Sequence, residues 1–124
     1  MKVWTEARLT QALLAEARLK GFVSIKRNDH STSGIPDATI TGLGRTCWIE
    51  VKYANPSFKS HGLQELTACR LALAGLCIYV IYDGPRNTVS IVAPKDLGQW
   101  REATQKAEGM NHSWVVEQIR ELCR

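Results

Sequence analysis

The sequence predicts an α/β domain in which a mixed sheet of about five strands is flanked by helices. Helical periodicity occurs near the start of the chain, over about 5–20, and again over about 63–74. The second helix separates two strand-like regions and would supply the crossover that parallel neighbours require. The strand-like runs, rich in β-branched and aromatic residues, are 22–27, 33–41, 45–52, 76–82 and 88–92.

Length and composition indicate one soluble globular domain. A chain of 124 residues can bury a single core, and 44% hydrophobic with 23% charged residues is ordinary for this class. The net charge of +4 is compatible with a polyanionic partner. The four cysteines show no zinc-ligand spacing. Because no signal-peptide pattern and no bilayer-length apolar run is present, we expect a cytoplasmic protein without a membrane partner.

The core of the domain is expected over about 5–93, followed by a C-terminal helical extension over about 94–124. Two helices are expected in the extension, at about 94–107 and 113–122, with a break over 109–112. Their large apolar residues are expected to pack mainly on the core, and some could form a dimer surface. These residues are Trp100, Trp114, Val115, Val116 and Ile119.

The first helix has Thr5 as a possible N-cap and Gly21 as a C-terminal stop. Glu6 falls on the same arc as the apolar residues of this helix, where an unpaired charge is unfavourable. Helix physics alone favours a first-turn glutamate that stays partly solvated and is stabilised by the helix dipole.

The most informative stretch is the pair of strand-like runs around the turn at 42–44. Either of two even-length turns at this point gives the same antiparallel register. In that register Asp37 lies directly opposite Glu50, with Cβ atoms about 4.5–5.5 Å apart. Lys52 is two residues farther along and points to the same face, about 6.6 Å along the strand. The sequence therefore predicts two carboxylates and one ammonium side by side.

Such a group is unfavourable unless a cation or a reacting group lies between the carboxylates. An ordinary Glu50–Lys52 pair on a solvated face explains two of the three residues. It leaves Asp37 facing another carboxylate without a counter-ion. Carboxylate oxygens, a backbone carbonyl and water are the ligands that Mg²⁺ prefers. On geometry alone, a magnesium site and a solvated face are comparably good explanations.

The stretches 34–37 (GIPD) and 49–52 (IEVK), followed by Gln64, resemble the motif of the PD-(D/E)xK nuclease superfamily. Within it, the chain looks most like the stand-alone virus-type replication-repair (VRR-NUC) nucleases, which are related to Holliday junction resolvases. The matching stretch runs from about residue 6 to residue 82. The resemblance implies a restriction-endonuclease-like core and a Mg²⁺-dependent endodeoxyribonuclease, which Mn²⁺ is also expected to support.

The resemblance also implies roles for individual residues. Lys52 is the expected cation that orients the attacking water and stabilises developing negative charge. Gln64 is the expected neutral group that positions water or phosphate, although a helix-boundary glutamine has an ordinary explanation as well. The metal ligands implied are Glu6, Asp37, Glu50 and the Val51 carbonyl.

Several basic residues are candidates for contacts to DNA phosphates, which are independent of base sequence. Each of them also has an ordinary explanation as a solubilising surface charge. The candidates are Lys26, Arg27, Arg45 and Lys59.

The favoured substrate is branched DNA such as a Holliday junction, in a bacterial or phage-infected cell. A homodimer is expected, because two symmetric cuts require two sites. One alternative is a restriction or homing-type nuclease, which the absence of a recognition domain disfavours. Another is a non-catalytic DNA-binding module on the same fold, which the presence of Asp37, Glu50 and Lys52 disfavours. The sequence contains no Gly-rich phosphate loop, GxSxG elbow or recognisable Cys–His pairing.

Overall fold

The computed structural model describes residues 4–26, 36–54 and 62–124, and of residues 62–66 it describes the backbone alone. One sheet runs in the order β1-β2-β3-β4-β5-β6, and every neighbouring pair is antiparallel except β3 and β4. The predicted mixed α/β class is confirmed, with six strands instead of about five. The strands are β1 (Val23–Lys26), β2 (Ala38–Gly42), β3 (Arg45–Ala54), β4 (Leu76–Asp83), β5 (Thr88–Val92) and β6 (Lys106–Glu108). The helices are α1 (Glu6–Leu19), α2 (Gly62–Ala74), the 3₁₀ helix η1 (Pro94–Glu102) and α3 (His112–Cys123).

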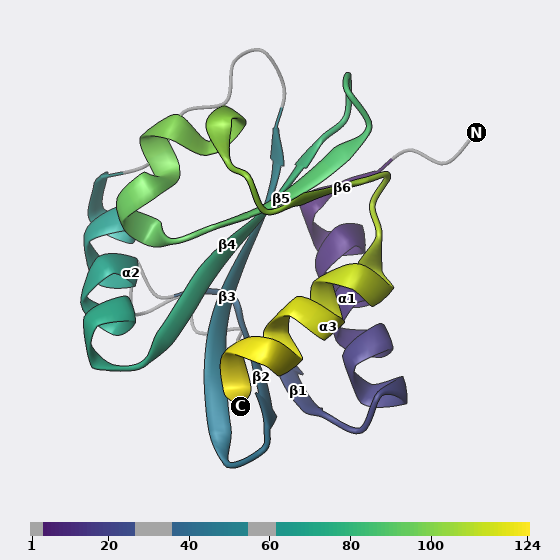
Figure 1. Ribbon diagram of the computed structural model, residues 1–124, viewed down its shortest axis with the longest axis vertical. Coiled ribbons are helices and arrows are strands. Elements are labelled where there is room, and N and C mark those ends of the chain that lie inside the picture. Colours follow the sequence, from purple (N-terminus) through teal and green to yellow (C-terminus); the bar gives the residue numbers. More distant parts are fainter. Residues whose placement is uncertain (1–3, 27–35, 55–61) are drawn as a thin grey trace.

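Helices cover both faces of the sheet (Figure 1): α1 and α3 lie on one face, and α2 and η1 on the other. Successive side chains of β3 point to opposite faces. Ile49 and Val51 pack in the apolar cluster with α1 and α3, whereas Ala54 packs in the cluster on the α2 and η1 face. Glu50 and Lys52 alternate with the first pair and therefore point to the α2 face.

The bounds of α1 agree with the capping residues in the sequence. Thr5 is the N-cap, and its Oγ1 accepts a hydrogen bond from the amide of Arg8 at 3.2 Å. Gly21, just past the helix, has a φ of 91°, which favours glycine. Glu6 is exposed, as helix physics favours for a first-turn glutamate, although it lies on the same arc as the apolar residues of this helix. The first turn of α1 lies beside the last residues of β3, where the sheet ends.

The β2–β3 hairpin has the register that the sequence predicts. Ala38 pairs with Ile49 and Gly42 with Arg45. The two turn residues between the strands both have positive φ, 55° and 78°. Turns of this kind match the twist of the paired strands, so the turn itself sets which residues of β2 and β3 are opposite each other.

The C-terminal part differs from the sequence prediction at one element. A helix is predicted over about 94–107, but η1 ends at Glu102 and β6 follows it. β6 supplies backbone partners for β5, and the amide of Ile91 donates to the carbonyl of Gln105 at 3.0 Å. An uncovered strand edge leaves backbone groups without partners, which explains why strand pairing replaces the local helical preference here.

α3 forms part of the core, as predicted for most apolar residues of this region. Val115, Val116 and Ile119 are fully buried and pack in the cluster that contains the apolar face of α1. Trp100 of η1 is buried in the cluster on the other face, and Trp114 is half-buried. None of the described helices is long and apolar enough to cross a membrane.

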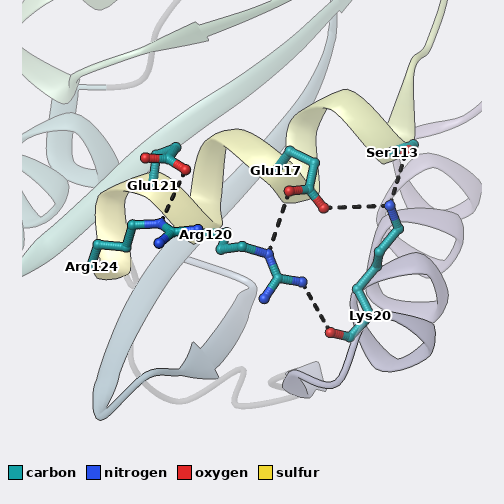
Figure 2. A network of polar contacts seen from close by, with 6 residues as sticks. All are labelled: Lys20, Ser113, Glu117, Arg120, Glu121 and Arg124. Carbon is teal, nitrogen blue, oxygen red and sulfur yellow. Dashed lines mark hydrogen bonds and ion pairs between the residues drawn. The ribbon is translucent and has the colours of Figure 1, made fainter.

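A polar network joins α3 to the C-terminal end of α1 (Figure 2). Lys20 Nζ lies 3.1 Å from Ser113 Oγ and 3.4 Å from Glu117 Oε1. Arg120 pairs with Glu117 and donates from Nη2 to the carbonyl of Lys20 at 3.1 Å. Partly exposed ion pairs of this kind contribute only about 0.2–1 kcal/mol each. Apolar burial therefore holds α3 in place, and the network orients it.

Candidate active site at the end of β3

Asp37 and Glu50 are neighbours, as the predicted register requires. Asp37 directly precedes β2, next to the paired Ala38 and Ile49. The amide of Asp37 donates to Glu50 Oε1 at 3.1 Å. Glu50 is buried, with 1% of its surface exposed, whereas Asp37 is exposed. The two carboxyl groups thus differ in environment, one facing solvent and one enclosed by protein.

Lys52 completes this group. Its Nζ lies 3.1 Å from Glu50 Oε2, and its side chain is 14% exposed. Burial raises the pKa of Glu50 to about 7; the Lys52 ammonium lowers it and the Asp37 carboxylate raises it further. One lysine therefore compensates the buried charge only in part, and an additional cation beside Glu50 would favour its ionised form.

Replacing Glu50 by Gln is expected to stabilise the metal-free protein at pH 8 and to have little such effect at pH 5. The pKa of Glu50 is about 7 in the folded protein, against an ordinary value of 4.5. Between these values the folded protein holds a proton that the unfolded chain has released, so the free energy of unfolding decreases as pH rises. The decrease amounts to at most about 3 kcal/mol. Glutamine does not titrate and removes this decrease.

The measurement is a series of urea denaturation curves from pH 4.5 to pH 8 in EDTA, for the natural protein and Glu50→Gln. The control is Glu16→Gln on α1, a residue that is far from Asp37, Glu50 and Lys52 in the sequence. Its free energy of unfolding should vary with pH as in the natural protein. Parallel pH profiles for the natural protein and Glu50→Gln would contradict the proposed burial effect.

Glu6 reaches the same end of β3 from the other face of the sheet. Its Oε1 accepts a hydrogen bond from the amide of Tyr53 at 3.3 Å, and Tyr53 directly follows Lys52. Glu6 belongs to α1, which covers the face opposite to the one that Glu50 occupies. Glu6 therefore lies at the end of the strand that carries Glu50 and Lys52, but not on their side.

The donors at this end of β3 fit a hard divalent cation by their chemistry. Asp37 and Glu50 supply adjacent carboxylate oxygens, and the raised pKa of Glu50 indicates an incompletely compensated charge. Val51 lies two residues beyond Ile49, the last residue of β3 that pairs with β2. Across the described ranges, no three His, Cys, Asp or Glu side chains are grouped closely enough to hold a metal. Glu6 lies on the opposite face of the sheet from Glu50, which agrees with the finding that these carboxylates do not form one group of three.

The remaining residues that the sequence analysis proposed for the site lie in different parts of the molecule, and some are not among the residues that the structure describes. Lys26 is the exposed last residue of β1 and pairs with Ala38, next to Asp37. Arg45 begins β3, five residues before Glu50, which is about 16 Å along the strand. Gln64 lies in the first turn of α2, and its side chain is outside the described set. Arg27 and Lys59 also fall outside the described residues.

The sequence analysis missed an aromatic cluster beside Glu6. The centroids of the Tyr53 and Tyr82 rings are 5.7 Å apart. The centroid of the Trp4 ring lies 6.5 Å from that of Tyr82 and 5.7 Å from that of His112. These contacts join the residue before α1 to β3, β4 and α3. Because successive side chains of β3 point to opposite faces, Tyr53 lies on the α1 face. This alternation in the sequence could have indicated the cluster. The cluster supports the backbone that Glu6 contacts.

The described pockets lie elsewhere. One, of about 430 Å³, lies along η1 and the end of β5, and one of about 380 Å³ lies between α2 and the start of η1. Neither is lined by Glu6, Asp37, Glu50 or Lys52. The candidate site is therefore distinct from these hollows.

No protein-family model and no curated protein matches the chain. Among solved structures, Hjc of Archaeoglobus fulgidus, a Holliday junction resolvase from an archaeal hyperthermophile, is similar with a TM-score of 0.52. The fold of this chain resembles that of Hjc. The match covers 73% of this chain and 73% of Hjc at 21% sequence identity. At that identity the likeness concerns the fold, which agrees with the predicted class and does not select the VRR-NUC nucleases among related groups.

Proposed function

We propose that this protein is a divalent-metal-dependent endonuclease that hydrolyses phosphodiester bonds in DNA, with a preference for branched DNA such as four-way junctions. One observation carries the proposal. A buried glutamate with a raised pKa, Glu50, is held between the Asp37 amide and the Lys52 ammonium at the end of β3. Perturbed ionisable groups that are gathered in this way are typical of reactive sites.

The proposed metal ligands are Asp37, Glu50 and the Val51 carbonyl, with Glu6 assisting from the other face. A divalent cation such as Mg²⁺ or Mn²⁺, held by these residues, would supply the positive charge that polarises a phosphate and lowers the pKa of water. Glu50 has to be ionised to bind a metal, so metal binding and proton release at Glu50 are linked.

The remaining side chains have roles of their own in this proposal. The Lys52 ammonium contacts Glu50 Oε2 and is placed to orient water and to stabilise negative charge that develops on the phosphate. Asp37 is exposed and faces the incoming DNA. Gln64 is proposed to position water or phosphate from the first turn of α2. Lys26 ends β1 and pairs with Ala38, so its side chain leaves the sheet on the face opposite to Glu50, and its proposed phosphate contact lies at the edge of the site.

The preference for branched DNA rests on the likeness in fold to Hjc, whose name states its substrate. Two symmetric cuts across a four-way junction require two sites, so we propose that the active form is a homodimer. The finer likeness to VRR-NUC nucleases, and a function in DNA recombination or repair, are part of this proposal. A sequence-specific nuclease and a non-catalytic DNA-binding module are the alternatives that the experiment below distinguishes.

The test is a cleavage assay that compares a four-way junction, a flap, a linear duplex and a single strand of matched sequence. Each substrate is incubated with Mg²⁺, with Mn²⁺ and with EDTA. We expect metal-dependent cutting that is fastest on branched DNA. Cutting of a linear duplex at one short sequence would favour the restriction-type alternative. Binding without cutting in either metal would favour the non-catalytic module.

Glu6→Gln is expected to weaken cleavage most at low Mg²⁺ and to recover partly at high Mg²⁺. Glutamine keeps an acceptor for the Tyr53 amide but removes the charge that would assist metal binding. Glu16→Gln, on the same helix, is the matched control and should leave the metal titration unchanged. A slightly lower melting temperature for Glu6→Gln with an unchanged titration would assign Glu6 a capping or helix-dipole role instead.

A further inference from the structure

The carboxyl end of β3 is paired on one side only in the described part of the chain. The pairing with β2 stops at Ala38 and Ile49, so the residues of β3 after Ile49 pair with β4 alone. This stretch contains Glu50, the Val51 carbonyl and Lys52, which are the proposed functional groups of β3. A strand with one neighbour has fewer backbone hydrogen bonds to fix it. The position of these groups therefore depends on what else holds the end of β3.

Tyr53, which directly follows Lys52, is held at three points. Its amide donates to Glu6 Oε1 at 3.3 Å. Its ring meets the Tyr82 ring edge-on, with centroids 5.7 Å apart and an angle of 69° between the two planes. Its hydroxyl lies against Gly84, in the turn between β4 and β5. One residue at the end of β3 is thus attached to α1, to β4 and to the turn that follows β4.

The contact between Tyr53 and Gly84 requires a residue without a Cβ atom at position 84. A methyl carbon on Gly84 would lie 2.9 Å from Tyr53 Cζ and closer still to the hydroxyl oxygen. The φ of Gly84 is outside the left-handed region, so alanine suits the backbone there. Glycine is used where another group approaches the backbone closely. At this position the approaching group is the Tyr53 side chain.

The turn that carries Gly84 is itself fixed by hydrogen bonds. The amide of Asn87 donates to the carbonyl of Gly84 at 3.1 Å, and the amide of Gly109 donates to the carbonyl of Asn87 at 2.7 Å. The Tyr82 hydroxyl donates to Asn87 Oδ1 at 2.7 Å, which joins the turn to the ring that Tyr53 packs on. A methyl group added at Gly84 would therefore displace the Tyr53 side chain, because the turn backbone is the more constrained partner.

We propose that Tyr53, packed on Gly84, is a positioning residue for the candidate active site. Its side chain lies on the face opposite to Glu50, so it acts through the backbone. It fixes the end of β3 and thereby the Val51 carbonyl and the Lys52 side chain. The inference deepens the proposed function and rests on it. Groups that orient metal ligands from outside the ligand set change metal affinity or activity by about 10-fold to 100-fold when they are replaced.

The test replaces Gly84 by alanine and leaves Tyr53 unchanged. Calorimetric titration measures the affinity of the full chain for Mn²⁺ without DNA, and hydrogen exchange in EDTA measures the protection of the Tyr53 amide. Gly84→Ala is expected to raise the Mn²⁺ dissociation constant about 10-fold to 100-fold and to reduce the protection of this amide. Cleavage of a four-way junction should need correspondingly more metal, while junction binding in EDTA stays unchanged.

Gly42→Ala is the matched control for a loss of stability. A methyl group there would meet the Phe22 ring as closely as one at Gly84 would meet Tyr53, but Gly42 lies at the turn before β3, far from its carboxyl end. Gly42→Ala should lower the free energy of unfolding and leave the Mn²⁺ affinity unchanged. Gly98→Ala, where the described structure has no atom within 4 Å of the added carbon, should change neither. An equal loss of Mn²⁺ affinity in Gly42→Ala would reduce the effect to general destabilisation and overturn the inference.

Variants of Tyr53 complete a double-mutant cycle with Gly84. Tyr53→Ala removes the ring and is expected to weaken Mn²⁺ binding about as much as Gly84→Ala does. Tyr53→Phe keeps the ring on Tyr82 and should recover most of that loss. In the Tyr53→Ala background, Gly84→Ala should have no further effect, because the ring that it displaces is absent. Additive losses would show that Gly84 acts independently of Tyr53, which also overturns the inference.

The separate readouts distinguish this inference from the proposed function. Natural cleavage by Gly84→Ala, with unchanged Mn²⁺ affinity and amide protection, would refute the positioning role and leave the nuclease standing. A natural protein that binds Mn²⁺ but cuts no DNA would refute the nuclease, and weaker Mn²⁺ binding by Gly84→Ala would then leave Tyr53 as the positioning residue of a metal site. A natural protein that binds no Mn²⁺ would overturn both.

Discussion

Glu50→Gln is expected to lower kcat/KM for DNA cleavage by about 100-fold to 1,000-fold while the protein stays folded. The substitution removes a proposed metal ligand and the charge that pairs with Lys52 at 3.1 Å. It keeps an oxygen that can accept the hydrogen bond from the Asp37 amide. Losses of about 100-fold to 1,000-fold are usual when one electrostatic group of a reactive site is removed. Asp37→Asn and Lys52→Ala are expected to reduce cleavage to a similar degree.

The measurement is single-turnover cleavage of a four-way junction in Mg²⁺, with binding followed separately by fluorescence anisotropy in EDTA. Asp96→Asn and Lys95→Ala, exposed changes on η1, are matched controls and should keep natural activity. The double variant Glu50→Gln with Lys52→Ala is expected to be no worse than the poorer single variant, because groups that act as a unit are not additive. Retained cleavage by purified Glu50→Gln would remove the central claim of the proposed function.

Ending the chain at Gly109, which removes α3, is expected to prevent cooperative folding. Val115, Val116 and Ile119 are fully buried and pack in the same cluster as α1, β2 and β3. Removing them exposes the apolar face of α1 to water. Within the full chain, Ile119→Ala alone is expected to lower the free energy of unfolding by about 2–5 kcal/mol, which is the usual result of truncating a large buried side chain.

Urea denaturation followed by circular dichroism measures both effects. Glu121→Ala is the control on the same helix, since Glu121 is exposed and its ion pair with Arg124 is at the surface; a change within about 0.5 kcal/mol is expected. A chain ending at Gly109 that unfolds with the natural midpoint would instead show that α3 is a separate extension of a completed core.

The group of Asp37, Glu50 and Lys52 could be predicted from the sequence because its geometry is local. A short turn sets the register of a hairpin, and the period of two in a strand sets which side chains share a face. The observed pairing of Ala38 with Ile49 follows from these two rules. The start and end of α1 are likewise decided by Thr5 and Gly21, whose capping roles depend on neighbouring residues alone.

Glu6 and β6 could not be predicted in the same way. Helical periodicity placed Glu6 on the apolar arc, but its exposure depends on where the sheet ends relative to α1. The helix predicted over about 94–107 is replaced from Lys106 by β6, because β5 presents an edge that needs backbone partners. The sequence around Ala107 carries no strong signal for a strand.

The sequence by itself determined which residues stand opposite each other at the candidate site, because turn length and strand alternation act over a few residues. Only the tertiary structure decided that Glu50 is buried and carries a raised pKa, that Glu6 meets the Tyr53 amide, and that β6 pairs with β5. These properties depend on which faces are covered by other elements. Burial and charge compensation arise from residues that are distant in the chain, and no local pattern contains them.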